Sequence, residues 1–240
     1  MRLPSELIDV AIHNGQSVRA GSRRLQDWSV SSPSSRRASL WTYYDRRAAH
    51  YEGGVSGALR YFRGLGVEVT PDAIGEELRE ITRQLARLPP ATFIDVGAGP
   101  GVFTAHLPGS GFALDQSEQA LRRLRAEAAG VPVIQADATA LPFAAKAVTR
   151  VFAGHLYGHL EPDERAAFLA EVHRVADELV ILDSGLPPGA VAEEWQRRSL
   201  PDGTTHTVYK RHFTIETLSA EVGGDPPFSG RYYVLLRSGY

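Results

Sequence analysis

The stretch that decides the fold is Phe93-Ile-Asp-Val-Gly-Ala-Gly-Pro-Gly101. Its apolar start, together with Thr92, is typical of a short buried strand, and three glycines follow it directly. So tight a turn favours glycine, because glycine adopts left-handed backbone angles and lets the chain approach a ligand closely. The pattern therefore predicts a strand, then a ligand-binding loop, then a helix.

Alternating strands and helices follow this loop. Further strands are expected at 111–115, 133–137, 148–153 and 179–183, and helices at 118–129 and 162–176. An apolar stripe predicts an earlier helix over 74–88, and the last quarter predicts one short helix within 187–202, another from 213 and a final strand at 232–237. This alternation predicts an α/β fold with a doubly wound, mostly parallel sheet.

Composition excludes several classes of protein and site. The 240 residues include no cysteine, which excludes disulfides, thiolate metal sites and a cysteine nucleophile. No apolar run approaches the roughly 18 residues of a membrane span, and the first residues lack the apolar core of a secretory signal, so we expect a cytoplasmic protein with no membrane partner. The net charge of −2 argues against a nucleic-acid partner.

Charge is distributed unevenly along the chain. Residues 1–63 contain ten arginines against five acidic residues. An ordinary solvated helical face would account for this excess. Attraction of an anionic substrate or partner is the alternative.

The spacing of the glycines separates two kinds of nucleotide loop. A dinucleotide-binding loop would place a third glycine at position 102, where this chain has Val102. Asp95, just ahead of the glycines, can instead face the ammonium group of a sulfonium nucleoside, which has no pyrophosphate to bind. A structural glycine turn between strand and helix is the alternative.

Two further acidic residues follow the next two predicted strands. Asp115 can accept hydrogen bonds from both hydroxyls of a ribose, as acids at this place also do in NAD enzymes. Asp137 can accept from an adenine amino group. Each alone could be a helix cap, but with Asp95 they form a set at the sheet edge where open α/β sheets bind ligands.

At this point the chain resembles a known family. The motifs 93–101, Ala113-Leu-Asp-Gln-Ser117 and Gln135-Ala-Asp-Ala-Thr-Ala-Leu-Pro-Phe143 are similar to three successive motifs of the Rossmann-like (class I) S-adenosylmethionine-dependent methyltransferases. The resemblance, over about 40–240, implies a seven-stranded sheet with an antiparallel last strand. It also implies S-adenosylmethionine as cofactor and S-adenosylhomocysteine as product. The cofactor would contact Asp95, Gly97, Ala98, Gly99, Gly101, Asp115, Gln116, Asp137, Ala138 and His155.

The chain departs from the family pattern in three places. Val148-Thr149 stands where the family often has Phe-Asp before the fourth strand. The sixth-strand region, Asp225-Pro-Pro-Phe228, is interrupted by prolines, and Pro108-Gly109 shortens the helix after the glycine loop. None of these departures removes a residue that we expect to bind the cofactor.

The resemblance also implies a lid. The stretch Tyr43–Tyr51 is similar to the N-terminal helix that often covers the cofactor in this family, so Tyr44 and Tyr51 are candidate lid contacts or, alternatively, core anchors. We therefore expect an N-terminal helical lid segment at 1–70, a methyltransferase domain at 71–240 and a substrate-lid insertion at about 186–213.

The segment after the fourth predicted strand would lie beside the transferable methyl group in this fold. His155 could take a proton from a hydroxyl or amine acceptor, and Tyr157 could orient that acceptor. His159, four residues on, is a second candidate, although either histidine could simply pack or bond the backbone. No carboxylate or third histidine is spaced to complete a metal site, so no metal is expected.

A polar cluster after the fifth predicted strand supplies candidate substrate contacts. His206 belongs to it, and Lys210 and Arg211 could clamp a carboxylate or phosphate, or be ordinary surface charges. Trp41 and Trp195 are candidates for an aromatic pocket wall, or for the core.

These observations predict methyl transfer from S-adenosylmethionine to a small-molecule acceptor in specialised metabolism. Three alternatives stay open: methylation of RNA or protein, a non-catalytic S-adenosylmethionine-binding protein, and an NAD-dependent oxidoreductase. A homodimer is also open, because the N-terminal segment can cover either its own site or that of a second copy.

Overall fold

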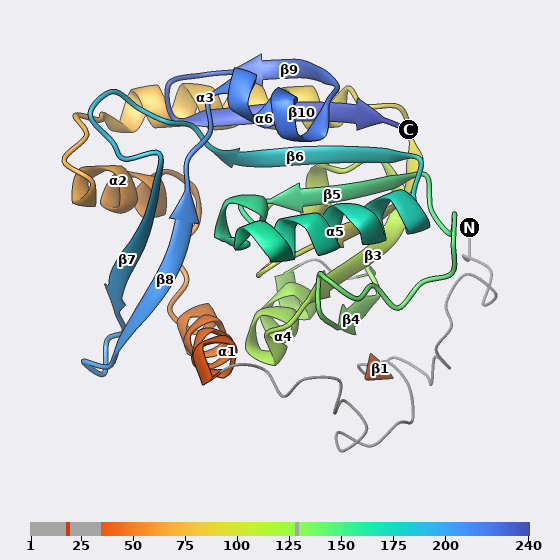
Figure 1. Cartoon of the computed structure of the whole chain (residues 1–240), viewed down its shortest axis with the longest axis horizontal. Coiled ribbons are helices and arrows are strands. Elements are labelled where there is room, and N and C mark those ends of the chain that lie inside the picture. Colours follow the sequence, from red (N-terminus) through yellow and green to blue (C-terminus); the bar gives the residue numbers. More distant parts are fainter. Residues whose placement is uncertain (1–17, 20–34, 128–129) are drawn as a thin grey trace.

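The centre of the chain is a twisted, mostly parallel sheet (Figure 1). The structure, a computed structural model, describes residues 18–19, 35–127 and 130–240. Within them the sheet has eight strands in the order β1-β4-β3-β2-β5-β6-β10-β9. They are β1 (Val18–Arg19), β2 (Ala91–Val96), β3 (Gly109–Asp115), β4 (Val133–Gln135), β5 (Arg150–Gly154), β6 (Glu178–Ser184), β9 (Asp225–Ser229) and β10 (Tyr233–Gly239).

Strand directions confirm the predicted topology. The pairs from β1 to β6 are all parallel, and β10 runs antiparallel to both β6 and β9. The last strand is therefore the antiparallel one, as the resemblance implies. The two-residue β1 adds an eighth strand to the seven expected.

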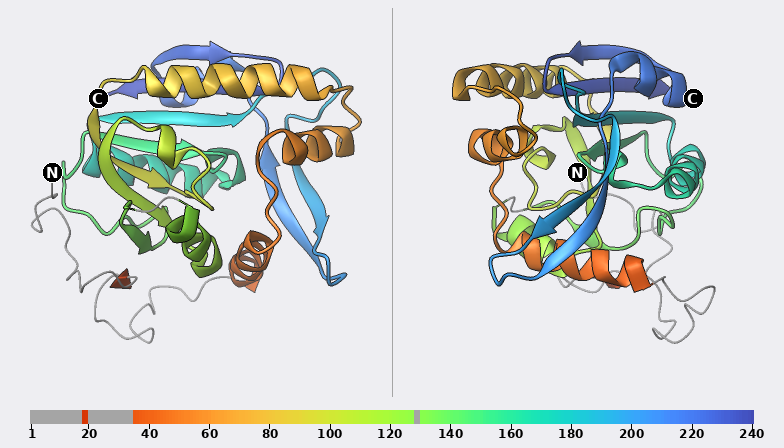
Figure 2. Two further views of the ribbon diagram at one scale, coloured as in Figure 1. Left: turned by 180° about the vertical axis from the view of Figure 1, so that it is seen from behind. Right: turned by 60° about the vertical axis from the view of Figure 1, so that its left-hand side comes forward.

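Helices cover both faces of the sheet (Figure 2). They are α1 (Ser35–Ala48), α2 (Gly54–Gly64), α3 (Pro71–Ala86), α4 (Glu118–Glu127), α5 (Pro162–Val175) and α6 (Ile215–Val222), with short 3-10 turns η2 (Thr104–His106) and η3 (Tyr157–His159). Successive side chains of a strand point to opposite faces. In β5, Val151 therefore joins the core with Phe168 of α5, whereas Phe152 packs with Ile81 and Leu85 of α3.

One predicted element is wrong. Residues 187–202 do not form a short helix; they contain β7 (Glu193–Ser199), which pairs with β8 (Thr205–Arg211) in a separate two-stranded hairpin. Exposure along β7 alternates residue by residue, as a strand requires, but the alternating side chains are mostly polar. The sequence therefore gives no apolar pattern with a period of two.

Three other elements differ from or refine the expectation. The proline-broken region does form a strand, β9, because it lies at the edge of the sheet, where proline costs no interior ladder bond. After the glycine loop the helix shrinks to the single 3-10 turn η2. Helix α2 was not predicted. Residues 1–17 and 20–34, about half of the arginine-rich segment, lie outside the described residues.

The fold gathers α1, α2 and the β7–β8 hairpin at the edge where β5 and β6 end (Figure 1). Tyr43 of α1 packs with Leu200 and Val208 of the hairpin. These elements therefore face the carboxyl ends of the parallel strands, where the sequence places its acidic residues. None of the helices in the described part of the chain is long and apolar enough to cross a membrane.

Candidate functional site

A cavity of about 480 Å³ lies at this edge of the sheet. The glycine loop and the ends of β3, β4 and β5 line one side of it, and α1, α2, β7 and β8 line the other. Such a volume is typical of small-molecule sites. The cavity brings together, from the predicted cofactor residues, Tyr44, Tyr51, Gly97, Ala98, Gly99, Asp115, Gln116, Asp137, Ala138 and His155.

The glycine loop needs glycine at two positions for different reasons. Gly99 has φ +56°, and an added Cβ would meet no atom within 4 Å, so the loop is open there rather than packed. Gly101 has φ +88°, and an added Cβ would lie 2.9 Å from Cγ of Leu124. The first glycine keeps the loop clear for a ligand, and the second lets the loop pack on α4.

Asp115 is held rigidly at the end of β3. One carboxylate oxygen accepts from the amide of Gly99 at 2.9 Å and the other from the amide of Ser117 at 2.8 Å. Burial raises the pKa of Asp115, although both hydrogen bonds oppose that shift. Because two backbone amides fix its carboxylate, Asp115 is suited to accept hydrogen bonds from a diol such as a ribose.

Asp137 closes the next side of the cavity after β4. Its Oδ1 accepts from the amide and the hydroxyl of Thr139, at 2.9 and 2.8 Å. Ala136 and Ala138 beside it also line the cavity, as does Gln116. This wall combines small side chains with a carboxylate, which is the arrangement that an adenine base and its amino group need.

Asp95 differs from the expectation. It is not among the residues that line the cavity; it lies behind the glycine loop, 2 % exposed, and accepts a 2.6 Å hydrogen bond from Thr104. Burial raises the pKa of Asp95 to about 7, against the effect of the Thr104 hydroxyl. In the described structure its evident role is to tie the glycine loop to η2.

This raised pKa predicts a pH-dependent stability. Between about pH 4 and 7 the folded chain holds a proton on Asp95 that the unfolded chain has lost, so the stabilisation from this group is full at low pH and disappears as the pH rises through about 7. In Asp95→Asn, whose amide oxygen can still accept from Thr104, this dependence should vanish. The free energy of unfolding of wild type minus that of the variant should then fall as the pH rises, by up to about 1.4 kcal/mol per pH unit.

Urea unfolding of both proteins at several pH values measures this difference. Subtracting the variant removes the opposite contribution of His155, whose folded pKa is lowered to about 4. A difference that is flat, or that rises with pH, would mean that Asp95 is ionised in the folded chain.

Helix α1 is fastened to the cofactor side of the cavity. Oδ1 of Asp45 accepts from the Ser117 hydroxyl at 2.9 Å and from the Gln119 amide at 3.1 Å, at the start of α4. Arg123 of α4 donates to the carbonyl oxygens of Ala48 and Tyr51. These bonds place the predicted lid residues Tyr44 and Tyr51, and the predicted pocket-wall residue Trp41, along the cavity.

The two candidate histidines both line the cavity, and both are neutral. Burial lowers the pKa of His155 to about 4 and holds that of His159 well below its usual range. Nδ1 of His159 lies 2.9 Å from the carbonyl oxygen of Tyr209. Because a carbonyl oxygen can only accept, Nδ1 is the donor in this hydrogen bond, and Nε2 of the neutral ring is an acceptor atom. His155 has φ +56°, a backbone angle uncommon for a side chain of this size.

Besides Asp95 and Gly101, which were predicted to contact the cofactor, four predicted catalytic or substrate residues lie outside the cavity lining. The Tyr157 hydroxyl donates to Glu221, and its ring stacks on Phe213 in the core, so it cannot orient an acceptor. Arg211 pairs with Glu221 at 2.6 Å. Trp195 is 41 % exposed on the outward face of β7, and His206 bonds Ser39 of α1 at 3.1 Å. Strand alternation explains Trp195, since it points away from its neighbours Glu194 and Gln196.

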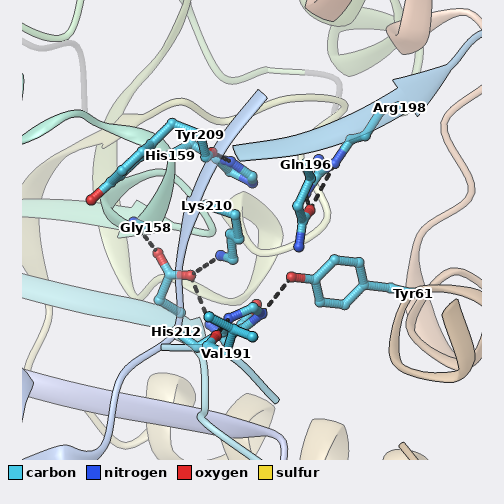
Figure 3. A network of polar contacts seen from close by, with 11 residues as sticks. Tyr61, Gly158, His159, Val191, Gln196, Arg198, Tyr209, Lys210 and His212 are labelled. Carbon is cyan, nitrogen blue, oxygen red and sulfur yellow. Dashed lines mark hydrogen bonds and ion pairs between the residues drawn. The ribbon is translucent and has the colours of Figure 1, made fainter. Parts of the chain in front are cut away.

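Lys210, in contrast, lines the cavity from β8 and is almost fully buried. Its ammonium donates to Oδ1 of Asp183 at 2.7 Å (Figure 3). Asp183 also accepts from the amides of Gly158 and Ser184, both at 2.7 Å. Burial alone would raise the pKa of Asp183, but the Lys210 ammonium and these hydrogen bonds hold it below its usual value.

The sequence did not predict several residues on the side of the cavity that α2 and β7 line. Tyr61 of α2 donates a 2.6 Å hydrogen bond to Nε2 of His212, whose Nδ1 donates to the Val191 carbonyl (Figure 3). Arg198 of β7 lies over the Tyr61 ring at 5.7 Å. The signal for Asp183 was present, since it is a further acid at the end of a parallel strand. For Arg198 and Tyr61 the sequence gives no such signal, because β7 and α2 were not predicted.

The described residues contain no group of three or more His, Asp or Glu side chains placed to hold a metal ion. The groups that the cavity offers are amides, carboxylates, hydroxyls, neutral imidazoles and a few cations.

Comparison with known proteins agrees with this geometry. Residues 93–178 match a family model described as "Methyltransferase domain". Comparison with the curated proteins gave no match.

Several solved structures share the fold. The structure described as "DhpI-SAM-HEP complex" is 21 % identical, with a TM-score of 0.61 over 87 % of this chain and 100 % of that one. The "DhpI-SAH complex structure" is 22 % identical, with a TM-score of 0.60 over 84 % and 96 %. The PH0226 protein from Pyrococcus horikoshii OT3 is 20 % identical, with a TM-score of 0.53 over 75 % and 98 %. At these identities the likeness establishes the fold, and the family-model match places a methyltransferase domain at residues 93–178 within it.

Proposed function

We propose that this chain methylates a small-molecule acceptor, in the cytoplasm and as part of specialised metabolism. The observation that carries the proposal is that one cavity of about 480 Å³ joins the nucleotide-type wall to a polar region lined by α1 and the hairpin. A covered cavity of this size suits a small acceptor better than a polymer. Two neighbours of the same fold are described as SAM or SAH complexes, which supports the cofactor assignment.

The residues present fit the cofactor. Asp115 would hold the ribose, Asp137 with Gln116 the adenine, and the open glycine loop at Gly99 the amino-acid part. When bound, S-adenosylmethionine supplies an electrophilic methyl group on its sulfonium.

The chain itself contributes positioning and exclusion of water. Displacement at a methyl group needs the attacking atom in line with the bond that breaks, so holding the acceptor still supplies much of the rate. We expect the fastened α1 and the wall formed by Tyr44 and Tyr51 to shield a bound acceptor from water. His155 lines this region, but its lowered pKa makes it a weak proton acceptor.

Calorimetric titration tests the cofactor assignment. Wild type should bind S-adenosylmethionine and S-adenosylhomocysteine and should not bind NAD. In Asp137→Asn, Oδ1 can still accept from Thr139 while the second oxygen becomes an amide donor, so binding should weaken by about tenfold. NAD bound in place of S-adenosylhomocysteine would contradict the proposal.

Methyl-labelled cofactor tests the acceptor class. With cell extract as the acceptor source, the label should enter the dialysable fraction in a reaction that requires the protein. Label in RNA or protein instead would favour a macromolecular methyltransferase. Cofactor binding without transfer to any fraction would favour a non-catalytic S-adenosylmethionine-binding protein.

A further inference from the structure

The cavity has a cationic region on its acceptor side, which we call the acceptor chamber and define by Arg47, Arg198, Lys210, Tyr44 and Tyr61. All five line the cavity, from α1, α2, β7 and β8. They share one cavity lining, and within it the guanidinium of Arg198 lies over the Tyr61 ring at 5.7 Å. Figure 3 shows the Tyr61 hydroxyl turned toward His212 and the Lys210 ammonium turned toward its carboxylate partner.

The charges in this chamber are not balanced. Asp183 neutralises Lys210, but Arg198 donates through Nε and Nη2 to the neutral amide oxygen of Gln196, at 3.1 and 2.5 Å. The guanidinium of Arg47 lies over the Tyr51 ring at 5.1 Å. Within residues 35–127 and 130–240, neither arginine has a carboxylate at ion-pair distance. Cations that share a half-buried site repel one another, so this arrangement favours an anion between them.

Tyr44 supplies an independent observation. Its hydroxyl oxygen is buried in the chamber and has no partner within the described structure. An unsatisfied buried hydroxyl is costly, and a bound oxyanion would accept its proton in a hydrogen bond. His159 sets the other boundary, since Nε2 is an acceptor atom in a neutral ring and would not attract an anion.

We propose that the methyl acceptor carries an oxyanion, a carboxylate or a phosphate-type group, which binds between Arg198 and Arg47 and accepts from the Tyr44 hydroxyl. This inference rests on the proposed function, because it names the class of molecule that enters the same site. Guanidinium groups suit such oxygens, since each can donate two parallel hydrogen bonds. An anion there would also bridge α1 and the β7 strand, which both line the same side of the cavity.

Binding of simple anions tests the proposal. Protein saturated with S-adenosylhomocysteine is titrated at low salt with inorganic phosphate, with benzoate, and with benzamide as a neutral counterpart of benzoate. We expect phosphate or benzoate to bind and benzamide not to bind. Binding of phosphate alone, benzoate alone or both identifies the kind of oxyanion, and each of these results supports the proposal.

A matched pair of variants locates the anion. Arg198→Gln should weaken anion binding by about tenfold or more, because a charge-assisted hydrogen bond is lost. The neighbouring Arg197→Gln should leave the affinity for the anion within about twofold of the wild-type value. Alternate side chains of a strand point to opposite faces, and Arg197 is on the exposed face. Unchanged binding of S-adenosylhomocysteine in both variants shows that they fold.

The outcomes separate this inference from the proposed function. If S-adenosylhomocysteine binds but neither anion does, or if the two arginine variants weaken anion binding equally, the oxyanion assignment is overturned and the methyltransferase proposal stands. If wild type does not bind S-adenosylhomocysteine, the proposed function fails, and this inference fails with it.

Discussion

Replacing Asp115 by alanine should weaken the binding of S-adenosylhomocysteine by at least about 100-fold. Its carboxylate is already fixed by the amides of Gly99 and Ser117, so it can offer its remaining lone pairs to two ribose hydroxyls without rearrangement. Each charge-assisted hydrogen bond contributes about 1.5–3 kcal/mol, and about 1.4 kcal/mol corresponds to tenfold in affinity. The variant also leaves the Gly99 amide without its acceptor, which loosens the loop.

Calorimetric titration measures this effect, and a nearby variant controls for it. Glu118→Ala removes an acid three residues further on that pairs with Arg122 at 2.9 Å on the exposed surface of α4. That change should leave the dissociation constant within about twofold, because surface ion pairs contribute little and Glu118 is not part of the cavity lining. If Asp115→Ala bound as tightly as Glu118→Ala, Asp115 would be a loop anchor and not a cofactor ligand.

The cofactor side of the site could be predicted because a general rule of α/β sheets applies to it. Parallel strands end at one edge, so Asp115 and Asp137 had to lie near the glycine loop whatever the details of the loops. The position of the Asp95 side chain was harder to predict, because the rule places its Cα but not the direction of its side chain. The side chain turns toward Thr104, behind the loop, which no spacing in the sequence reveals.

The acceptor side could not be predicted from the same kind of pattern. Strand β7 turns Glu194, Gln196 and Arg198 toward the cavity side, and a strand whose inward face is polar shows no apolar alternation. The prediction of a short helix at 187–202 was wrong for this reason, and Arg198 was therefore not predicted as a site residue. Trp195 was predicted to line the pocket because it is aromatic, but it lies on the outward face.

Gly158 shows how a local residue choice depends on distant parts of the chain. A Cβ at this position would lie 2.5 Å from the carbonyl oxygen of Arg211 and 2.8 Å from the ammonium of Lys210. Glycine is therefore needed so that η3 can pack directly against β8 and the Asp183–Lys210 pair. Sequence reasoning considered the histidines and Tyr157 of this stretch but not Gly158, whose amide and lack of a side chain support the buried ion pair.

That ion pair carries the second large prediction: Asp183→Ala should destabilise the fold by about 3–5 kcal/mol. The Asp183 and Lys210 side chains are 0 % and 2 % exposed, so the variant leaves a buried ammonium without its partner. It also removes the acceptor for the amides of Gly158 and Ser184. Urea unfolding measures the loss of free energy.

A double-mutant cycle distinguishes pairing from simple loss of packing. Lys210→Met alone leaves a buried carboxylate and should also be costly, but Asp183→Ala with Lys210→Met removes both charges together. The double variant should therefore lose less than the sum of the two single losses, by about 2 kcal/mol or more. Asp177→Ala is the matched control, since its pair with Lys146 is 60 % and 52 % exposed, and it should cost less than about 1 kcal/mol. Additive losses in the cycle would mean that Lys210 is held in the cavity by its surroundings and not by Asp183, and the charge balance of the acceptor chamber would then have to include one more cation.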